Sequence, residues 1–94
     1  MNTANANLDG IVVEGNKCTV SYNTASNNGF VGIEADGTGH LITQNVAMNN
    51  GSLFGEPLDY QINCPSTVTN NTSTNGFPTS YEIFGTDCHL ANNQ

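Results

Sequence analysis

The sequence contains no Arg, no Trp and only one Lys, although eight of its 94 residues are Asp or Glu. The formal net charge is −7, and Lys17 alone cannot replace the phosphate counterions that nucleic-acid binding displaces. No apolar run approaches the ~18 residues of a membrane-spanning helix, and the polar residues after Met1 do not form a signal peptide. We therefore expect neither nucleic acid nor membrane as a partner. A helical bundle is also disfavoured, because the chain is rich in Asn (16 residues), Thr (11) and Gly (10), which are poor helix formers.

The Asn residues recur with a regular period. The pattern of an apolar residue followed three positions later by Asn aligns the chain at 20–23, 42–45, 68–71 and 90–93, and Asn2 fits one period earlier. The five anchor residues are spaced by 21, 22, 26 and 22 positions. Columns of small or apolar residues on both sides of the anchors fall into the same register. Self-similarity of this length is the mark of a stacked repeat protein.

Each period holds three short alternating stretches separated by Gly, Asn or Asp, which is the pattern of half-buried strands joined by turns. Stacked on themselves ~4.8 Å apart, such strands predict an all-β fold, a parallel β-helix of about four coils in one domain spanning residues 1–94. We expect a first sheet from 11–13, 33–35, 60–62 and 81–83, and a second from 18–22, 40–44, 66–70 and 88–92. The third comprises the short segments after each anchor, with small residues at a tight inward corner (Ala4, Ala25, Ala47 and Ser73).

The anchors are interpreted as a structural ladder made of Asn2, Asn23, Asn45, Asn71 and Asn93. At the bend between the second and third strands, stacked side-chain amides hydrogen-bond to one another along the coil axis. Asn also tolerates the left-handed backbone that such a bend requires. A ligand-binding row is the alternative interpretation of the same residues.

The repeat, with its recurring Gly-Ile, Asn-Thr-Ala and Asn-Asn-Gly motifs, resembles the right-handed parallel β-helix proteins of the pectin-lyase-like superfamily over nearly the whole chain. The stretches at 63–72 and 85–88 are similar to the last coils of uncharacterised bacterial members. The resemblance implies the fold but not the chemistry, because such members include lyases, hydrolases, epimerases, adhesins and tailspikes. The cationic base of pectate lyases has no counterpart here, and Gly39-His40-Leu41 is only a fragment of the polygalacturonase pattern.

Two outward columns of the first sheet carry carboxylates. In the column of Val12, Glu34, Gln61 and Glu82, the two Glu residues lie two rungs apart, about 9.6 Å. That separation is near the upper limit of the ~6.5–9.5 Å between the carboxylates of inverting glycosidases. Glu34 and Glu82 are therefore the catalytic candidates if the chain is an enzyme, and a solvated acidic face is the alternative. Glu14, Asp36 and Asn63 form the neighbouring column, a candidate site for Ca²⁺. No other cofactor is expected.

The cysteines and histidines give weaker signals. Cys18 and His40 share a column, but two side chains are too few for a zinc site, so a packed and hydrogen-bonded His40 is expected. Cys18 and Cys88 are three rungs apart, too far for a disulfide. Cys64 and Cys88 lie on adjacent rungs, so the sequence leaves open whether they form a disulfide that pins the last coil or remain thiols. A bond would imply an oxidising compartment.

The third coil is longer than the others by an insertion at 50–59, and insertions in repeat proteins often form the binding face. Phe54 lies in it, while Phe30 and Phe77 occupy the corresponding loops of neighbouring coils. These rings are candidates for stacking on sugars, with hydrogen bonds from the nearby polar residues (Glu34, Asp59, Gln61 and Glu82). Alternatively, the rings fold over the corner and seal the core.

Taken together, the sequence favours a non-catalytic extracellular or cell-surface module, structural or glycan-binding, with a polysaccharide or glycan surface as its partner. The alternative is the terminal part of a polysaccharide-active enzyme. No capping helix precedes Asn2, although solenoids usually cover their end faces. We therefore expect either further N-terminal coils or end-to-end association of copies.

Overall fold

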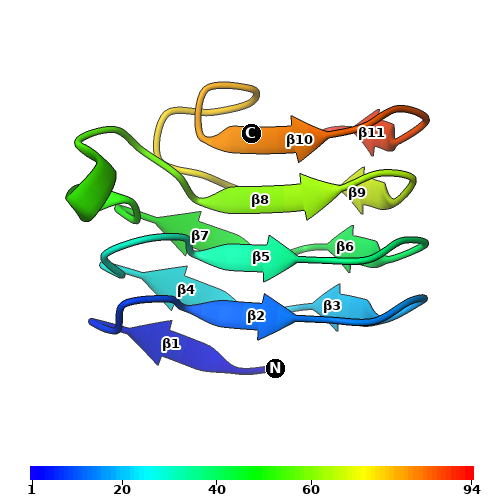
Figure 1. Cartoon of the computed structure of the whole chain (residues 1–94). Coiled ribbons are helices and arrows are strands. Elements are labelled where there is room, and N and C mark those ends of the chain that lie inside the picture. The colour runs from blue at the N-terminus through cyan, green and yellow to red at the C-terminus, as the bar shows by residue number, and fades with distance from the viewer.

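The computed structural model describes residues 1–94 and contains eleven short strands arranged in three parallel sheets. The chain rises as a right-handed coil from the N-terminus at one end to the C-terminus at the other (Figure 1). The first sheet comprises β2 (Ile11–Val13), β5 (Ile33–Ala35), β8 (Tyr60–Asn63) and β10 (Tyr81–Phe84). The second comprises β3 (Thr19–Ser21), β6 (Leu41–Thr43), β9 (Thr67–Thr69) and β11 (His89–Ala91). The third comprises β1 (Thr3–Asn5), β4 (Thr24–Ser26) and β7 (Val46–Met48). The predicted parallel β-solenoid with three strands per coil is confirmed.

The strand register matches the predicted columns. Ile33 of β5 pairs with Ile11 of β2 and with Tyr60 of β8, and Val20 of β3 pairs with Ile42 of β6. Because every strand pairs with its equivalent one coil away, all side chains of one column point to the same face of the solenoid. The inward columns form a core of ten buried residues (Val20, Ala25, Ile33, Ala35, Ile42, Ala47, Tyr60, Ile62, Val68 and Tyr81).

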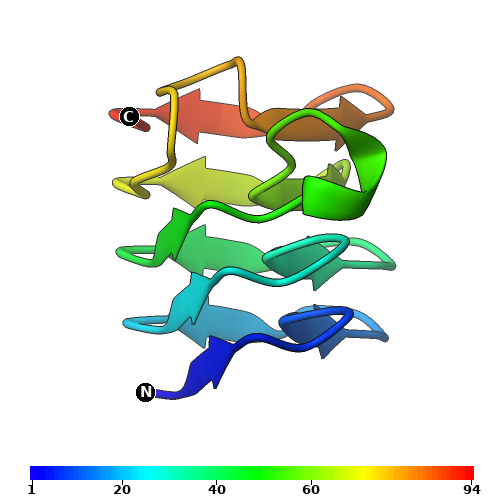
Figure 2. The same cartoon turned by 90° about the vertical axis from the view of Figure 1, so that its left-hand side faces the viewer.

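The third sheet is shorter than predicted. The sequence suggested a fourth strand at Thr72-Ser73, but only a single bridge joins Thr72 to Val46. Beyond it, the Ser73 backbone N–H donates to the Gln94 carbonyl oxygen and the Thr74 N–H donates to Asp59 Oδ2. These bonds draw the chain out of the sheet and into the loop that leads to β10, which Figure 2 shows above the third sheet.

The bends place the left-handed backbone one residue earlier than expected. The residue before each of the last four anchors has a positive φ, namely Tyr22 (56°), Gln44 (57°), Asn70 (57°) and Asn92 (55°), whereas the anchors do not. A left-handed residue ends the preceding strand, which explains why the second-sheet strands end one residue earlier than predicted. The anchor can then turn its side chain inward.

The insertion of the third coil folds as a single turn of 3-10 helix, η1 (Ser52–Phe54), which protrudes from the corner between the third and first sheets (Figure 2). None of its residues is buried. It lies between two left-handed glycines, Gly51 (φ 92°) and Gly55 (φ 75°). The insertion is therefore an addition to the outside of the solenoid. No helix in the chain is long and apolar enough to cross a membrane.

Candidate functional site

The predicted anchor ladder is formed. The side-chain amide of Asn23 donates to Asn45 Oδ1 at 3.1 Å, that of Asn45 to Asn71 Oδ1 at 3.0 Å, and that of Asn71 to Asn93 Oδ1 at 3.0 Å. At the N-terminal end, Asn2 joins the ladder through its backbone N–H, which donates to Asn23 Oδ1 at 2.7 Å. The amide nitrogens also bond backwards, for example from Asn45 to the Val20 carbonyl oxygen at 2.8 Å. The anchors are structural rather than a ligand-binding row, because their buried polar atoms are occupied by one another.

A second ladder runs along the corner between the third and first sheets. The amide of Asn28 donates to Asn50 Oδ1 at 2.8 Å, and the amide of Asn50 donates to Asp59 Oδ1 at 2.8 Å. Asn7 joins through its backbone N–H, which donates to Asn28 Oδ1 at 2.9 Å. The interpretation from sequence missed this ladder, although Asn7, Asn28 and Asn50 each follow an anchor by five residues. This constant offset is the sequence feature from which the second ladder could have been predicted.

Asp59 is not a glycan contact, which corrects the prediction from sequence. Its side chain is 0 % exposed. One carboxylate oxygen ends the second ladder and the other accepts the Thr74 N–H at 2.7 Å. The carboxylate thus replaces the next Asn of the ladder at the point where the long third coil breaks the repeat.

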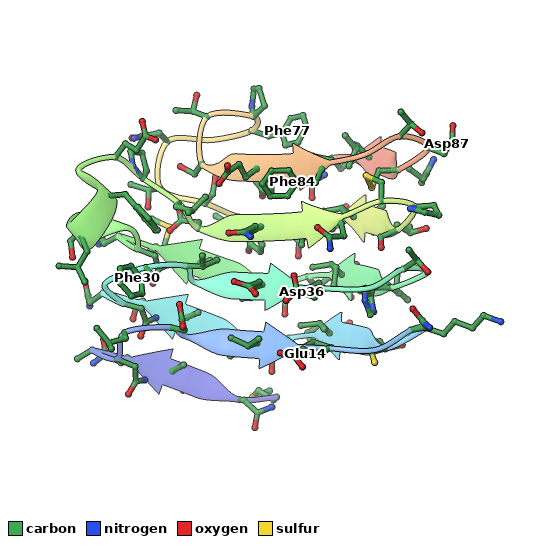
Figure 3. All side chains as sticks on the ribbon, viewed as in Figure 1. Glu14, Phe30, Asp36, Phe77, Phe84 and Asp87 are labelled. Atoms are coloured by element: carbon green, nitrogen blue, oxygen red, sulfur yellow. A yellow bond between two sulfur atoms is a disulfide. The ribbon has the colours of Figure 1, made fainter.

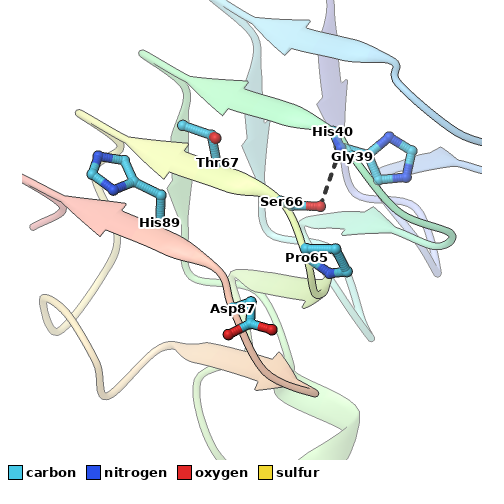
Figure 4. Close-up of a pocket in the computed structure, with 7 residues that line it drawn as sticks. All are labelled: Gly39, His40, Pro65, Ser66, Thr67, Asp87 and His89. Atoms are coloured by element: carbon cyan, nitrogen blue, oxygen red, sulfur yellow. Dashed lines mark hydrogen bonds between the residues drawn. The ribbon is translucent and has the colours of Figure 1, made fainter.

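His40 is packed in the corner between the first and second sheets, as expected. Its ring is 1 % exposed. The Nδ1 atom accepts the Cys18 backbone N–H at 3.2 Å, so Nε2 carries the proton and donates to the Asp36 carbonyl oxygen at 2.7 Å. In the next coil, Ser66 Oγ accepts the His40 N–H (Figure 4). Both ring nitrogens are therefore used by the backbone, and His40 has no lone pair left for a metal.

A cavity of about 180 Å³ lies beside this corner (Figure 4). Polar and small residues from the last three coils line it, namely Gly39, His40, Pro65, Ser66, Thr67, Asp87 and His89. Ser66 Oγ donates to the Asn63 carbonyl oxygen at 2.8 Å rather than to a basic side chain, so its hydroxyl is not activated as a nucleophile in this arrangement. Across the whole chain, no group of three or more His, Cys, Asp or Glu side chains is arranged to hold a metal ion.

The carboxylates of the first sheet occupy the predicted columns. Val12, Glu34, Gln61 and Glu82 are in register. The same register continues to Glu14 and Asp36, which lie at corresponding ends of β2 and β5 (Figure 3). Asn63 then pairs with Phe84 in the last coil. Glu14, Asp36 and Asn63 therefore share a column but offer fewer oxygen atoms than the six to eight that Ca²⁺ requires.

Glu34 is the most perturbed of these carboxylates. A hydrogen bond with the Asp36 side chain, partial burial and the negative charges of Asp36, Asp9 and Glu14 raise the pKa of Glu34 to about 7. Each of these effects disfavours the charged form. Near neutral pH, Glu34 is thus a half-protonated carboxyl on an acidic face.

Stability should therefore fall as the pH rises toward the pKa of Glu34. A carboxyl whose pKa is higher in the folded state than in the unfolded state binds its proton more tightly when folded, so this contribution is present at low pH and lost as the pH rises to about 7. We expect Glu34→Gln, which mimics the protonated form, to be more stable than the wild type above that pH and equally stable in acid. Urea unfolding across the pH range measures this difference. Glu82→Gln removes the same charge from the same column as the control, and an equal gain there would contradict the assignment.

The aromatic row is only partly formed. The Phe30 and Phe54 rings pack with their centroids 5.3 Å apart and tilted by 43°. Phe77 instead packs edge-on against Tyr81 at 5.0 Å, and in Figure 3 it lies in the last coil, away from Phe30. Tyr81 itself stacks on the buried Tyr60 at 4.5 Å, so Phe77 covers the core. The predicted three-ring row is therefore a pair.

The apolar surface around this pair extends to two leucines. A side chain placed at Gly29 would contact both Leu53 and Leu8, at 2.9 Å and 3.8 Å from its Cβ, so these leucines flank the same loop. Leu53, Leu8 and Phe54 are 61, 63 and 53 % exposed. We call Leu8, Phe30, Leu53 and Phe54 the apolar platform. It extends across three coils, with Leu8, Leu53 and Phe54 exposed and Phe30 half-buried.

Cys64 and Cys88 form a disulfide with their Cα atoms 5.1 Å apart. This settles the alternative that the sequence left open and ties β8 to the segment before β11. Cys18 is a half-buried free thiol. Its Sγ donates a long hydrogen bond of 3.8 Å to the Asn16 carbonyl oxygen.

Comparisons with protein-family models, with curated proteins and with solved structures found no match to this chain.

Proposed function

We propose that this chain is a non-catalytic β-helix module, related to the pectin-lyase-like superfamily, that binds carbohydrate outside the cell. The observation that carries the proposal is the apolar platform. Exposed aromatic rings on a rigid scaffold provide flat surfaces for the apolar faces of sugar rings. Contiguous apolar patches on a soluble protein commonly mark interaction sites.

The competing interpretation, in which the insertion seals the core, fits these residues poorly. Leu53 and Phe54 belong to η1, which has no buried residue. The core beneath is already closed by the second ladder and by fully buried residues such as Ile33 and Ala25. The ring that does seal the core is Phe77, through its contact with Tyr81. The platform therefore contributes little to stability and is available to a ligand.

The disulfide supports the location outside the cell. Disulfides persist in oxidising compartments and are rare in the reducing cytosol. A narrow solenoid with ten core residues also gains from a covalent link in the way that small secreted domains do.

The test is a glycan array followed by calorimetry on the oligosaccharide that binds. We expect Phe54→Ala to weaken binding about ten-fold, because it removes one of the two stacking faces. Leu41→Ala, an equally apolar substitution at an exposed position of the second sheet, should leave the affinity unchanged. An array without any bound glycan, or equal losses in both variants, would contradict the proposal.

One observation favours an alternative, the terminal part of a polysaccharide-active enzyme. The pKa of Glu34, raised to about 7, suits a general acid near neutral pH, and Glu82 lies two rungs away in the same column. A reducing-sugar assay on each bound glycan separates the two functions. Turnover that disappears in Glu34→Gln would establish the enzyme, whereas binding without turnover supports the module.

A further inference from the structure

The apolar platform borders a face whose charge is almost entirely negative. The outward face of the first sheet carries Glu14, Glu34, Asp36 and Glu82, which are four of the eight acidic residues in the chain. The only Lys or Arg side chain in the sequence is that of Lys17. It lies in the turn that follows β2. The neighbouring side chains of the same columns are Val12, Gln61 and Asn63, so no cation is interleaved among the carboxylates.

The platform and the carboxylates form one continuous surface. The Phe30 backbone N–H donates to the Leu8 carbonyl oxygen at 2.7 Å, which holds the two platform loops together. Asp9 follows Leu8 directly and lies close enough to Glu34 for its charge to act on that carboxyl. From Phe30 the surface continues along β5 to Asp36 at the far end of the strand, with Glu14 beside it (Figure 3). An extended ligand on the platform would therefore meet successive carboxylates.

The charge of this surface determines which sugars it can accept. A polymer of uronic acids or sulfated sugars would bring further negative charge against these carboxylates, which is electrostatically unfavourable. A neutral sugar would stack on the platform but would leave the repulsion among the carboxylates unrelieved. A sugar with a protonated amine satisfies both features, because its ring stacks on the aromatic pair while its ammonium pairs with a carboxylate.

Resting on the carbohydrate binding proposed above, we propose that the ligand is a cationic amino-sugar polymer, lying across the apolar platform and along the carboxylates of the first sheet. The 2-amino group of each glucosamine-type unit pairs with Asp9 or with a carboxylate at the far end of β5. The apolar faces of the rings pack on Phe30 and Phe54. No covalent step is involved.

The test compares oligomers of glucosamine, N-acetylglucosamine and galacturonic acid, together with polylysine, by calorimetry at mildly acidic pH, where the amine is protonated. We expect the glucosamine oligomer to bind most tightly and to lose affinity as salt is added. Asp9→Asn should weaken its binding about three-fold, in the range of an exposed ion pair. Asp87→Asn is the same chemical change at the opposite corner of the solenoid (Figure 3) and should have no effect.

The outcomes separate this inference from the function on which it rests. Equal affinity for the glucosamine and N-acetylglucosamine oligomers would overturn the inference and leave carbohydrate binding intact. Polylysine bound as tightly as glucosamine, with no loss in Phe54→Ala, would overturn it in favour of unspecific attraction to a negative surface. Binding of the galacturonate oligomer alone would overturn it as well. Failure of all the sugars to bind would overturn the proposed function itself.

Discussion

Replacing Asn45 with Ala is expected to lower the free energy of unfolding by about 4 kcal/mol. Asn45 is buried in the middle of the anchor ladder. Its Oδ1 accepts two hydrogen bonds from Asn23, and its amide donates to Asn71 and to the Val20 carbonyl oxygen. The Ala side chain makes none of these bonds, so the backbone N–H and amide of Asn23 lose their acceptor and the Val20 carbonyl loses the donor that Asn45 provides. A buried polar group without a partner costs about 1–3 kcal/mol.

This loss is a large part of the roughly 5–15 kcal/mol that stabilises a typical domain. Urea unfolding followed by circular dichroism measures it. Asn75→Ala is the matched control, since Asn75 is exposed and its side chain forms no hydrogen bond, and we expect a change below about 0.5 kcal/mol. A loss in Asn45→Ala no larger than that in the control would mean that the ladder contributes nothing to stability.

Removing the disulfide with the double substitution Cys64→Ala and Cys88→Ala is expected to cost about 3.5 kcal/mol. The bond joins residues separated by 24 positions in the sequence. Closing a loop of this length restricts the unfolded chain, and the restriction accounts for that magnitude. The last coil should be destabilised most. Its strand β11 follows the disulfide directly and lies at the edge of the second sheet, where Leu90 is 38 % exposed.

The measurement compares urea unfolding with and without a reducing agent. Reduction should destabilise the wild type to the level of the double variant and leave that variant unchanged. Cys18→Ala controls for the loss of a thiol, because Cys18 is unpaired and only half-buried, and it should respond to reduction as the wild type does. Three titratable thiols in the unfolded, unreduced wild type would show that the bond does not form.

The mutual arrangement of the glycan-binding candidates was only partly predictable. Phe30 and Phe54 lie together as the spacing suggested, and Glu34 and Glu82 occupy one outward column. Asp59 and Phe77 were assigned to the same surface, but the structure uses Asp59 to end the second ladder and Phe77 to cover Tyr81. Asp59 lies at the end of the insertion, where the period is broken, and Phe77 lies in the loop before β10, in the coil where the third sheet has no fourth strand. Counting residues from an anchor cannot locate side chains there.

The periodic part of this protein could be predicted from its sequence: the three parallel sheets, the inward and outward columns and the anchor ladder. In a parallel stack each residue pairs with its equivalent one coil away, so a pattern repeated every 21 to 26 residues predicts both the local structure and its long-range partner. The remaining features could not be predicted without the three-dimensional structure. The pairing of Cys64 with Cys88, the carboxylate cap of the second ladder and the exposed platform on η1 all depend on where irregular loops cross the coils. The paths of these loops are determined by contacts between loops whose sequences do not repeat from one coil to the next.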